Sequence, residues 1–203
     1  MRERTLMMIA RVVSILLTPF YLPLAGLVAL FIFSYMSQLP FWYKILVLLL
    51  VYLFTALLPR MLIRLYTNYH GWKLFALHQR ERRMVPYLIS IVSYFLCFYV
   101  MNMLRMPSFM SRIVVVALFI QILCAIINVW WKLSTHMAAI GGFVGALLAF
   151  AALYGFNPLW WLSLLLIISG ILGTSRMILR QHSLSQIIGA FFIGLICAFV
   201  VII

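Results

Sequence analysis

Acidic side chains are almost absent from this sequence. Its 203 residues include 15 Lys+Arg but only 2 Asp+Glu, so the formal net charge is +13. With Glu3 and Glu81 as the only side-chain carboxylates, a paired-carboxylate glycosidase site, a carboxylate metal cage and a carboxylate proton relay through a bilayer are almost excluded. Any catalysis must therefore come from His, Arg, Lys and hydroxyl groups.

Charged residues of either sign are also scarce, and so are cysteines in a reactive pattern. Charged residues make up 8% of the chain, against about 25% in a soluble domain. Hydrophobic residues make up 67%, and the mean hydropathy is +1.20. Cys97, Cys124 and Cys197 lie inside long apolar runs without C-x-x-C spacing, which is typical of small buried packing residues. The composition predicts an integral membrane protein.

Apolar runs long enough to cross a bilayer, which takes about 20 residues in a helix, fill most of the chain. Pro, Gly or charged residues separate seven of them, at residues 21–37, 42–63, 86–104, 110–132, 137–153, 158–174 and 186–203. Residues 2–18 carry three arginines ahead of Pro19 and Pro23, and we expect them to form an uncleaved interfacial helix. We expect an all-α polytopic bundle of six to seven spans, with residues 1–203 as a single integral membrane domain.

Small residues recur four positions apart in the predicted spans. The pairs are Ala138 and Gly142, Gly141 and Gly145, and Ala190 and Gly194. Residues at this spacing share one face of a helix, and small side chains there let two helix backbones approach closely in a membrane. We expect these faces to be helix–helix contacts.

Counting the crossings places most cations at one membrane face. The opposite face receives only short turns. The cation-rich face receives residues 1–20, 64–85, 133–136 and 175–185. Twelve of the fifteen cations belong to it, leaving only Lys44, Arg105 and Arg112 for the other face, and so do the four histidines, His70, His78, His136 and His182. The positive-inside rule and attraction to anionic lipid account for most of the cations. They do not explain why the histidines gather there.

Two short motifs on that face combine histidine with hydroxyl and basic side chains. Residues 132–136 have the sequence K-L-S-T-H, closing one span and opening the next. The second motif, S-R-x5-H-x3-Q, runs from Ser175 to Gln186 between the last two spans. Two spans separate the motifs, which returns the chain to the same face. We therefore expect one pocket that contains His136, Arg176 and His182.

These motifs resemble the second and third signature motifs of the type 2 phosphatidic acid phosphatase superfamily, membrane enzymes that remove phosphate from lipids. The family carries P-S-G-H and, later, S-R-x5-H-x3-D. Ser134 and His136 match the earlier motif, and Ser175, Arg176 and His182 match the later one with the same spacing. The resemblance implies a phosphatase-like core over about residues 110–203.

The chain departs from the family pattern at several positions. Leu133 and Thr135 replace the Pro and Gly of P-S-G-H, and Gln186 replaces the final Asp. The family's first motif, K-x6-R-P, is missing from the region that precedes residue 132. Gln186 is the most consequential departure, because an amide brings no negative charge to the histidine that it faces.

The resemblance implies a role for each matching residue. His182 would be the nucleophile that forms a phosphohistidine, and His136 would be the general acid for the leaving alcohol. The phosphate-binding groups would be Arg176, Ser134 and Ser175, with Lys132 supplying the charge of the missing first-motif lysine. Gln186 would orient His182, and no metal or other cofactor is implied.

The same residues also have structural interpretations. Ser134 or Thr135 can cap the helix that begins near His136. Residues 183–186, S-L-S-Q, form a capping-box sequence, and Arg176 can extend its guanidinium to the membrane interface. These roles do not conflict with phosphoryl transfer, in which Arg neutralises phosphate oxygens while imidazoles attack phosphorus and donate a proton.

We therefore expect a membrane lipid phosphatase-like protein that hydrolyses a phosphomonoester or diphosphate of a lipid through a phosphohistidine intermediate. The alternative is a catalytically inactive family member that binds phosphorylated lipid. A channel or transporter is disfavoured, because no span carries an ionisable residue near its centre. The expected partners are the phosphorylated lipid and membrane lipids, with no nucleic acid. The expected location is a bacterial inner (cytoplasmic) membrane.

Overall fold

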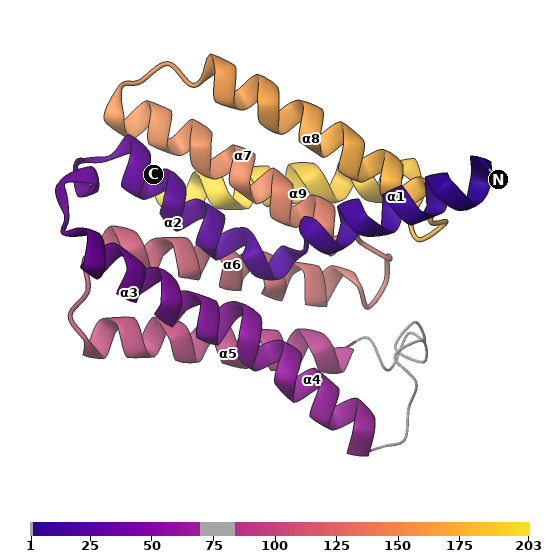
Figure 1. Cartoon of the computed structure of the whole chain (residues 1–203), viewed down its shortest axis with the longest axis horizontal. Coiled ribbons are helices and arrows are strands. Elements are labelled where there is room, and N and C mark those ends of the chain that lie inside the picture. Colours follow the sequence, from indigo (N-terminus) through magenta and orange to yellow (C-terminus); the bar gives the residue numbers. More distant parts are fainter. Residues whose placement is uncertain (1, 70–83) are drawn as a thin grey trace.

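A computed structural model describes residues 2–69 and 84–203 of the chain (Figure 1). Those residues form helices and connecting turns. The α-helices are α1 (Arg2–Leu16), α2 (Leu22–Phe33), α3 (Phe41–Tyr52), α4 (Leu58–Tyr69), α5 (Met84–Met103), α6 (Ser108–Ile127), α7 (Thr135–Tyr154), α8 (Leu159–Ile178) and α9 (Leu184–Ile202). Two 3₁₀ turns, η1 (Pro19–Tyr21) and η2 (Tyr35–Gln38), and one π-helical turn, η3 (Leu53–Leu57), interrupt them. The predicted histidines His70 and His78 lie outside the described residues.

Seven segments of this described part are long and apolar enough to cross a membrane. Five are the single helices α5 to α9, close to the ranges predicted from the sequence. The other two are composite: Glu3–Phe33 contains α1, η1 and α2, and Phe41–Tyr69 contains α3, η3 and α4. The all-helical bundle with seven candidate spans is confirmed, and it supports an integral membrane protein.

The N-terminal segment differs from the separate interfacial helix that we predicted. Figure 1 shows α1 and α2 as successive parts of one interrupted helical segment that runs along the bundle. Helix α1 packs against α8. The prolines do break the helix, but each also begins the next helical piece, with Pro19 in the first turn of η1 and Pro23 in the first turn of α2. Proline is tolerated there because its missing N–H lacks a helical partner anyway.

Arg60 holds this break in place from the second composite segment. Its Nη1 donates to the Tyr21 hydroxyl at 2.9 Å, and its guanidinium lies 4.7 Å from the centre of the Tyr21 ring and 5.4 Å from that of Phe20. The π-helical turn η3 ends just before Pro59, where a proline ring and its missing N–H disturb regular α-helix hydrogen bonding. The two irregular segments therefore meet and stabilise each other.

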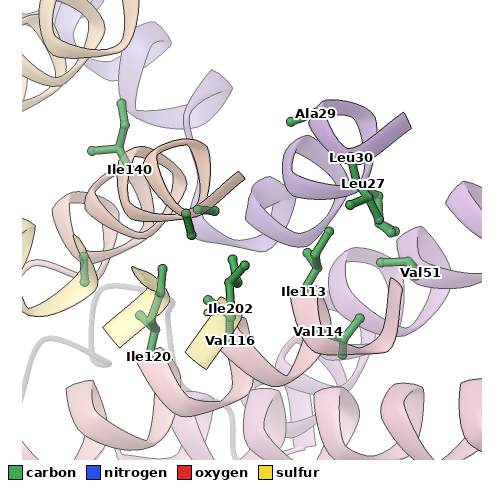
Figure 2. Packing of buried hydrophobic residues seen from close by; sticks show 14 of the residues in the cluster. Leu27, Ala29, Leu30, Val51, Ile113, Val114, Val116, Ile120, Ile140 and Ile202 are labelled. Carbon is green, nitrogen blue, oxygen red and sulfur yellow. The ribbon is translucent and has the colours of Figure 1, made fainter. Parts of the chain in front are cut away.

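The buried centre of the bundle combines aliphatic side chains from α2, α3, α6, α7 and α9 (Figure 2). Helices α7 and α9 form its closest contact, because small residues face each other there. A Cβ atom added to Gly141, Gly145 or Gly194 would overlap a backbone carbonyl of the partner helix. The predicted small-residue contact faces are confirmed. Of the cysteines predicted to be buried packing residues, Cys97 and Cys124 are buried and Cys197 is partly buried.

We expect Gly194→Ala to lower the free energy of unfolding by about 1–3 kcal/mol, since the added methyl group meets the Ala138 carbonyl oxygen. The matched control is Gly170→Ala, because a Cβ at that position meets nothing within 4 Å. Alanine in an open helical position is up to about 1 kcal/mol better than glycine, so the control is expected to be neutral or stabilising. Thermal unfolding in detergent measures the stability of both variants. Equal losses of stability in Gly194→Ala and Gly170→Ala would contradict the close α7–α9 contact.

The two predicted motifs emerge at the same end of the bundle. Figure 1 places the N-terminus, the α6–α7 connection and the α8–α9 connection at one end, whereas the C-terminus and the α7–α8 connection lie at the other. This arrangement follows from the two spans, α7 and α8, that separate the motifs. The crossing count therefore predicted the placement of both motifs correctly.

Candidate functional site

Asn128 organises the connection that leads into the first motif. Its Oδ1 accepts from the Leu133 N–H at 3.0 Å, and its Nδ2 donates to the Tyr87 hydroxyl at 2.9 Å and to the Cys124 carbonyl at 2.8 Å. One buried amide thus joins the end of α6, helix α5 and the residue before Ser134. The turn that presents the first motif is held by these hydrogen bonds.

Replacing Asn128 with alanine is expected to lower the free energy of unfolding by about 1–3 kcal/mol, since the buried Leu133 N–H loses its acceptor. Asn157→Ala is a matched control at the opposite end of the bundle, where an exposed asparagine accepts from the Leu159 N–H. Water replaces that hydrogen bond, so the free energy of unfolding of the control is expected to stay within about 0.5 kcal/mol of the wild-type value. Chemical denaturation in detergent compares the two, and an Asn128→Ala protein as stable as the control would contradict this role.

Ser134 stands at the N-cap position of α7, but its side chain makes no capping hydrogen bond. Its Oγ is buried, and it has no hydrogen-bond partner among the described residues. The capping role that the sequence allowed for Ser134 is therefore absent. The hydroxyl remains available for a ligand at the N-terminus of α7, where backbone N–H groups favour anions.

His136 lies in the first turn of α7 and meets groups from three other parts of the chain. The main chain of Ser14 in α1 lies near its imidazole, and the charges of Arg176 and His182 act on it electrostatically. Its Nδ1 is buried without a hydrogen-bond partner among the residues described. The two predicted motifs therefore lie near enough to each other for Arg176 and His182 to influence His136 electrostatically.

The end of α8 is shaped by a Schellman-type turn. The Gln181 N–H bonds to the Arg176 carbonyl at 3.1 Å, and the Arg180 N–H bonds to the Met177 carbonyl at 2.8 Å. Arg180 has a φ of 51°, in the left-handed region that glycine usually occupies at this position. The turn directs the chain back from Arg176 toward His182 and α9.

Gln186 determines which nitrogen of His182 carries a proton. Its side chain lies 3.2 Å from the Ser183 N–H and 3.3 Å from His182 Nδ1. A backbone N–H can only donate, so the amide atom that faces it is the carbonyl oxygen. His182 Nδ1 must then donate to the same oxygen, which leaves the lone pair of the neutral ring on Nε2. The predicted capping box and the predicted histidine contact are both present.

The remaining predicted site residues have different positions. Ser175 is buried and its hydroxyl donates to the Ile171 carbonyl at 2.8 Å, so its proton is already used within α8. Arg176 lies in the last turn of α8, and its Nε is buried without a partner in the described part of the chain. Lys132 is the first residue of the K-L-S-T-H motif and is partly buried. Arg176 is the cation whose charge acts on His136.

Five buried polar atoms at this end of the bundle have no hydrogen-bond partner within the described ranges. They are Ser14 Oγ, Ser134 Oγ, His136 Nδ1, Arg176 Nε and Gln181 Oε1. Buried polar groups are almost always paired, so such a set indicates a place for water or for a polar ligand. With a guanidinium, two imidazoles, a hydroxyl and a helix N-terminus together, the chemistry of this site suits an anion.

Two cavities lie on either side of His136. One of about 170 Å³ is lined almost wholly by apolar side chains of α1, α2, α7 and α8, including Leu17, Phe143 and Ile168. The other, of about 240 Å³, lies between η1 and helices α5, α6 and α7, with the polar side chains of Ser90 and Gln121 in its wall. His136 thus lines both an apolar space and a space with several polar groups in its wall, as an amphipathic ligand requires.

The sequence did not indicate the contribution of α1 to the site. Ser14 reaches His136 through its main chain, and a main-chain contact depends on no particular side chain. The three arginines of this segment instead suggested a role at the membrane surface. Only the packing of α1 against α8 reveals that the N-terminal segment closes one side of the site.

Comparisons with protein families, with curated proteins and with solved structures found no match to the chain. The fold and the site are therefore characterised by their own geometry. They define a helical membrane protein with seven candidate spans and a basic, histidine-containing site at one end of its bundle.

Proposed function

We propose that this protein is a lipid phosphatase of the type 2 phosphatidic acid phosphatase kind, acting on a phosphomonoester or diphosphate of a membrane lipid. The observation that carries the proposal is the electrostatic effect of Arg176 and His182 on His136, whose Nδ1 is buried without a partner in the described part of the chain. Arg176 and Ser134 bind the phosphate oxygens. The cavities beside His136 hold the lipid alcohol.

In the first step His182 Nε2 attacks phosphorus with its lone pair, while Gln186 accepts the hydrogen bond from Nδ1. The bond between phosphorus and the lipid oxygen breaks, and that oxygen takes a proton from His136, which the negative charge of the bound phosphate holds as an imidazolium between buried groups and Arg176. The products are the lipid alcohol and a phosphohistidine. The guanidinium of Arg176 neutralises the equatorial oxygens, which supplies most of the stabilisation in phosphoryl transfer.

In the second step a water molecule attacks the phosphohistidine. The neutral His136 accepts a proton from this water, the bond between phosphorus and Nε2 breaks, and inorganic phosphate is released. His182 is neutral again and His136 is again an imidazolium. One acid that acts as a base in the return step restores the enzyme without any additional proton carrier.

A second function is supported by Gln186. The oxygen that faces His182 also accepts the Ser183 N–H and carries no charge, so it stabilises an attacking imidazole less than a carboxylate does. A site with this arrangement binds phosphorylated lipid equally well without turning it over. The second candidate is therefore a catalytically inactive binder of lipid phosphate.

Phosphate release from a panel of purified lipids tests the proposal. The protein in detergent or nanodiscs is expected to release inorganic phosphate from at least one of phosphatidic acid, phosphatidylglycerol phosphate and polyprenyl diphosphate. Lipid binding is measured in parallel by native mass spectrometry. Binding without release supports the inactive binder, and neither binding nor release by any lipid of the panel would refute both functions.

A further inference from the structure

Polar side chains follow one face of α5 into the bundle from the end that carries the site. Tyr87, Ser90 and Tyr94 recur three or four residues apart, so they share that face. Helix α6 packs against α5 and carries Gln121 and Asn128, which share a face because seven residues are about two helical turns. Both helices are candidate spans, and a polar side chain within a span is costly unless it is hydrogen-bonded.

The polar faces of the two helices meet. Asn128 Nδ2 donates to the Tyr87 hydroxyl at 2.9 Å near the helix ends, and the side chain of Gln121 lies near the Tyr94 hydroxyl deeper in the bundle. Gln121 and Tyr94 are both buried, and the Tyr94 hydroxyl has no hydrogen-bond partner among the described residues. A buried hydroxyl in this state indicates a place for water or for another polar ligand.

Two spaces lie along these polar faces. The outer one is the cavity of about 240 Å³ beside His136, with Ser90, Gln121 and Thr135 in its wall. The inner one measures about 10 Å³, and Gln121 and Thr135 line it together with Tyr94. A buried water needs about 10–15 Å³ and two to four polar partners. The inner space therefore suits one water molecule, and the outer space suits several.

The outer space is close to the end of the bundle. Ser90 lies six positions after Met84, where α5 begins, and Gln121 lies six positions before Ile127, where α6 ends. Six residues of helix span about 9 Å. His136 is in the first turn of α7 at the same end. The polar faces of α5 and α6 therefore lead from the helix ends to one side of His136, whereas the apolar cavity lies on its other side.

We propose that the outer space is a water-filled inlet, and that Gln121 holds the water that reaches His136 from the α5–α6 side. The use of this water rests on the proposed phosphatase function and narrows it, because the lipid alcohol is then left to the apolar cavity. The water oxygen bonds to phosphorus, the bond between phosphorus and His182 Nε2 breaks, and a water proton passes to His136. The Gln121 amide both donates and accepts hydrogen bonds, so it is a positioning residue for this water.

Cysteine labelling tests whether the inlet contains water, and it does not depend on turnover. Ser90→Cys places a thiol in the outer space, and Ala25→Cys is the matched control in the apolar cavity. The full-length protein in nanodiscs is treated with hydroxyethyl methanethiosulfonate, a neutral and water-soluble reagent, and peptide mass spectrometry separates each label from labels on the native cysteines. The thiolate is the reacting form and is disfavoured in apolar surroundings. We expect Ser90→Cys to be labelled about tenfold faster than Ala25→Cys.

The role of Gln121 is tested first in the Ser90→Cys protein. Gln121→Met replaces the amide with an apolar group of similar size, and it is expected to lower the labelling rate of Ser90→Cys severalfold, because an apolar wall retains fewer waters. The matched control is Ser169→Ala. Ser169 is a buried polar residue of α8 whose hydroxyl donates to the Leu165 carbonyl, and its removal is expected to leave the labelling rate unchanged.

Kinetics on a lipid that the protein hydrolyses then separate the two chemical steps. Gln121→Met is expected to slow the attack of water on the phosphohistidine by about tenfold, because the water loses its position. Release of the lipid alcohol in the first turnover is expected to keep its wild-type rate. Rapid-quench measurements therefore show a burst of alcohol ahead of phosphate, together with accumulated phosphohistidine. A purely structural defect would slow both steps alike.

The outcomes distinguish the inlet from the phosphatase. Labelling of Ser90→Cys no faster than that of Ala25→Cys would overturn the inlet, even if the protein releases phosphate. An unchanged labelling rate in Gln121→Met, or equal slowing of alcohol and phosphate release, would overturn the role of Gln121. If Ser90→Cys is labelled rapidly while no lipid of the panel loses phosphate, the water-filled inlet stands and the proposed phosphatase function fails.

Discussion

Removing the guanidinium of Arg176 is expected to weaken binding of lipid phosphate by about 100-fold. The residue supplies a partly buried positive charge that acts on His136, and its Nε is buried. Truncating one partner of a buried, hydrogen-bonded charge pair costs about 2–5 kcal/mol, and each 1.4 kcal/mol is a factor of ten. Native mass spectrometry or a radiolabelled-lipid assay with purified Arg176→Ala measures the loss.

A cation at the opposite end of the bundle separates this effect from general attraction to anionic lipid. Arg105 is exposed and has a φ of 51°. Arg105→Gly therefore removes the charge and also removes the steric cost of a side chain at a positive φ. Its affinity for phosphorylated lipid is expected to stay within about twofold of wild type, since exposed charges contribute little. If both variants lose the same affinity, the basic end of the bundle only attracts anionic membranes.

The spans and their order were predictable because a bilayer imposes a single strong rule on the sequence. Every crossing needs about 20 apolar residues, and this requirement appears in the sequence without any knowledge of packing. The crossing count alone then placed the two motifs at the same end of the bundle, where Figure 1 shows the α6–α7 and α8–α9 connections. The contact between His182 and Gln186 also agrees with the sequence, since the capping box turns the Gln186 side chain back toward the residues that precede α9.

The parts of the site that escaped prediction depend on contacts between distant segments. Pro19 suggested an end to the N-terminal helix, but the chain continues along the bundle because Arg60 holds the break through Tyr21 and Phe20. Ser175 matched a motif, yet its hydroxyl bonds within its own helix. Such choices depend on the partners that the fold supplies, which periodicity and spacing do not identify.

A carboxylate at position 186 is expected to raise phosphatase activity by about tenfold or more. The side chain of Gln186 reaches His182 Nδ1 at 3.3 Å, and glutamate has the same length. Gln186→Glu therefore places a negative charge where the imidazole becomes cationic during attack. Loss of the equivalent charge in an unrelated catalytic triad lowers kcat by about 10⁴, so even a partial gain is measurable as phosphate release.

The same change separates an enzyme from a binder. Gln186→Glu preserves the acceptor for the Ser183 N–H, and glutamate in the first turn of α9 is favoured by the helix dipole, so the fold is expected to persist. His182→Ala is expected to abolish phosphate release while lipid binding stays nearly intact, because Arg176 and Ser134 remain. If His182→Ala releases phosphate at the wild-type rate, His182 is not the nucleophile and the proposed mechanism fails. If wild type and Gln186→Glu both bind phosphorylated lipid without releasing phosphate, the site recognises lipid phosphate and does not hydrolyse it.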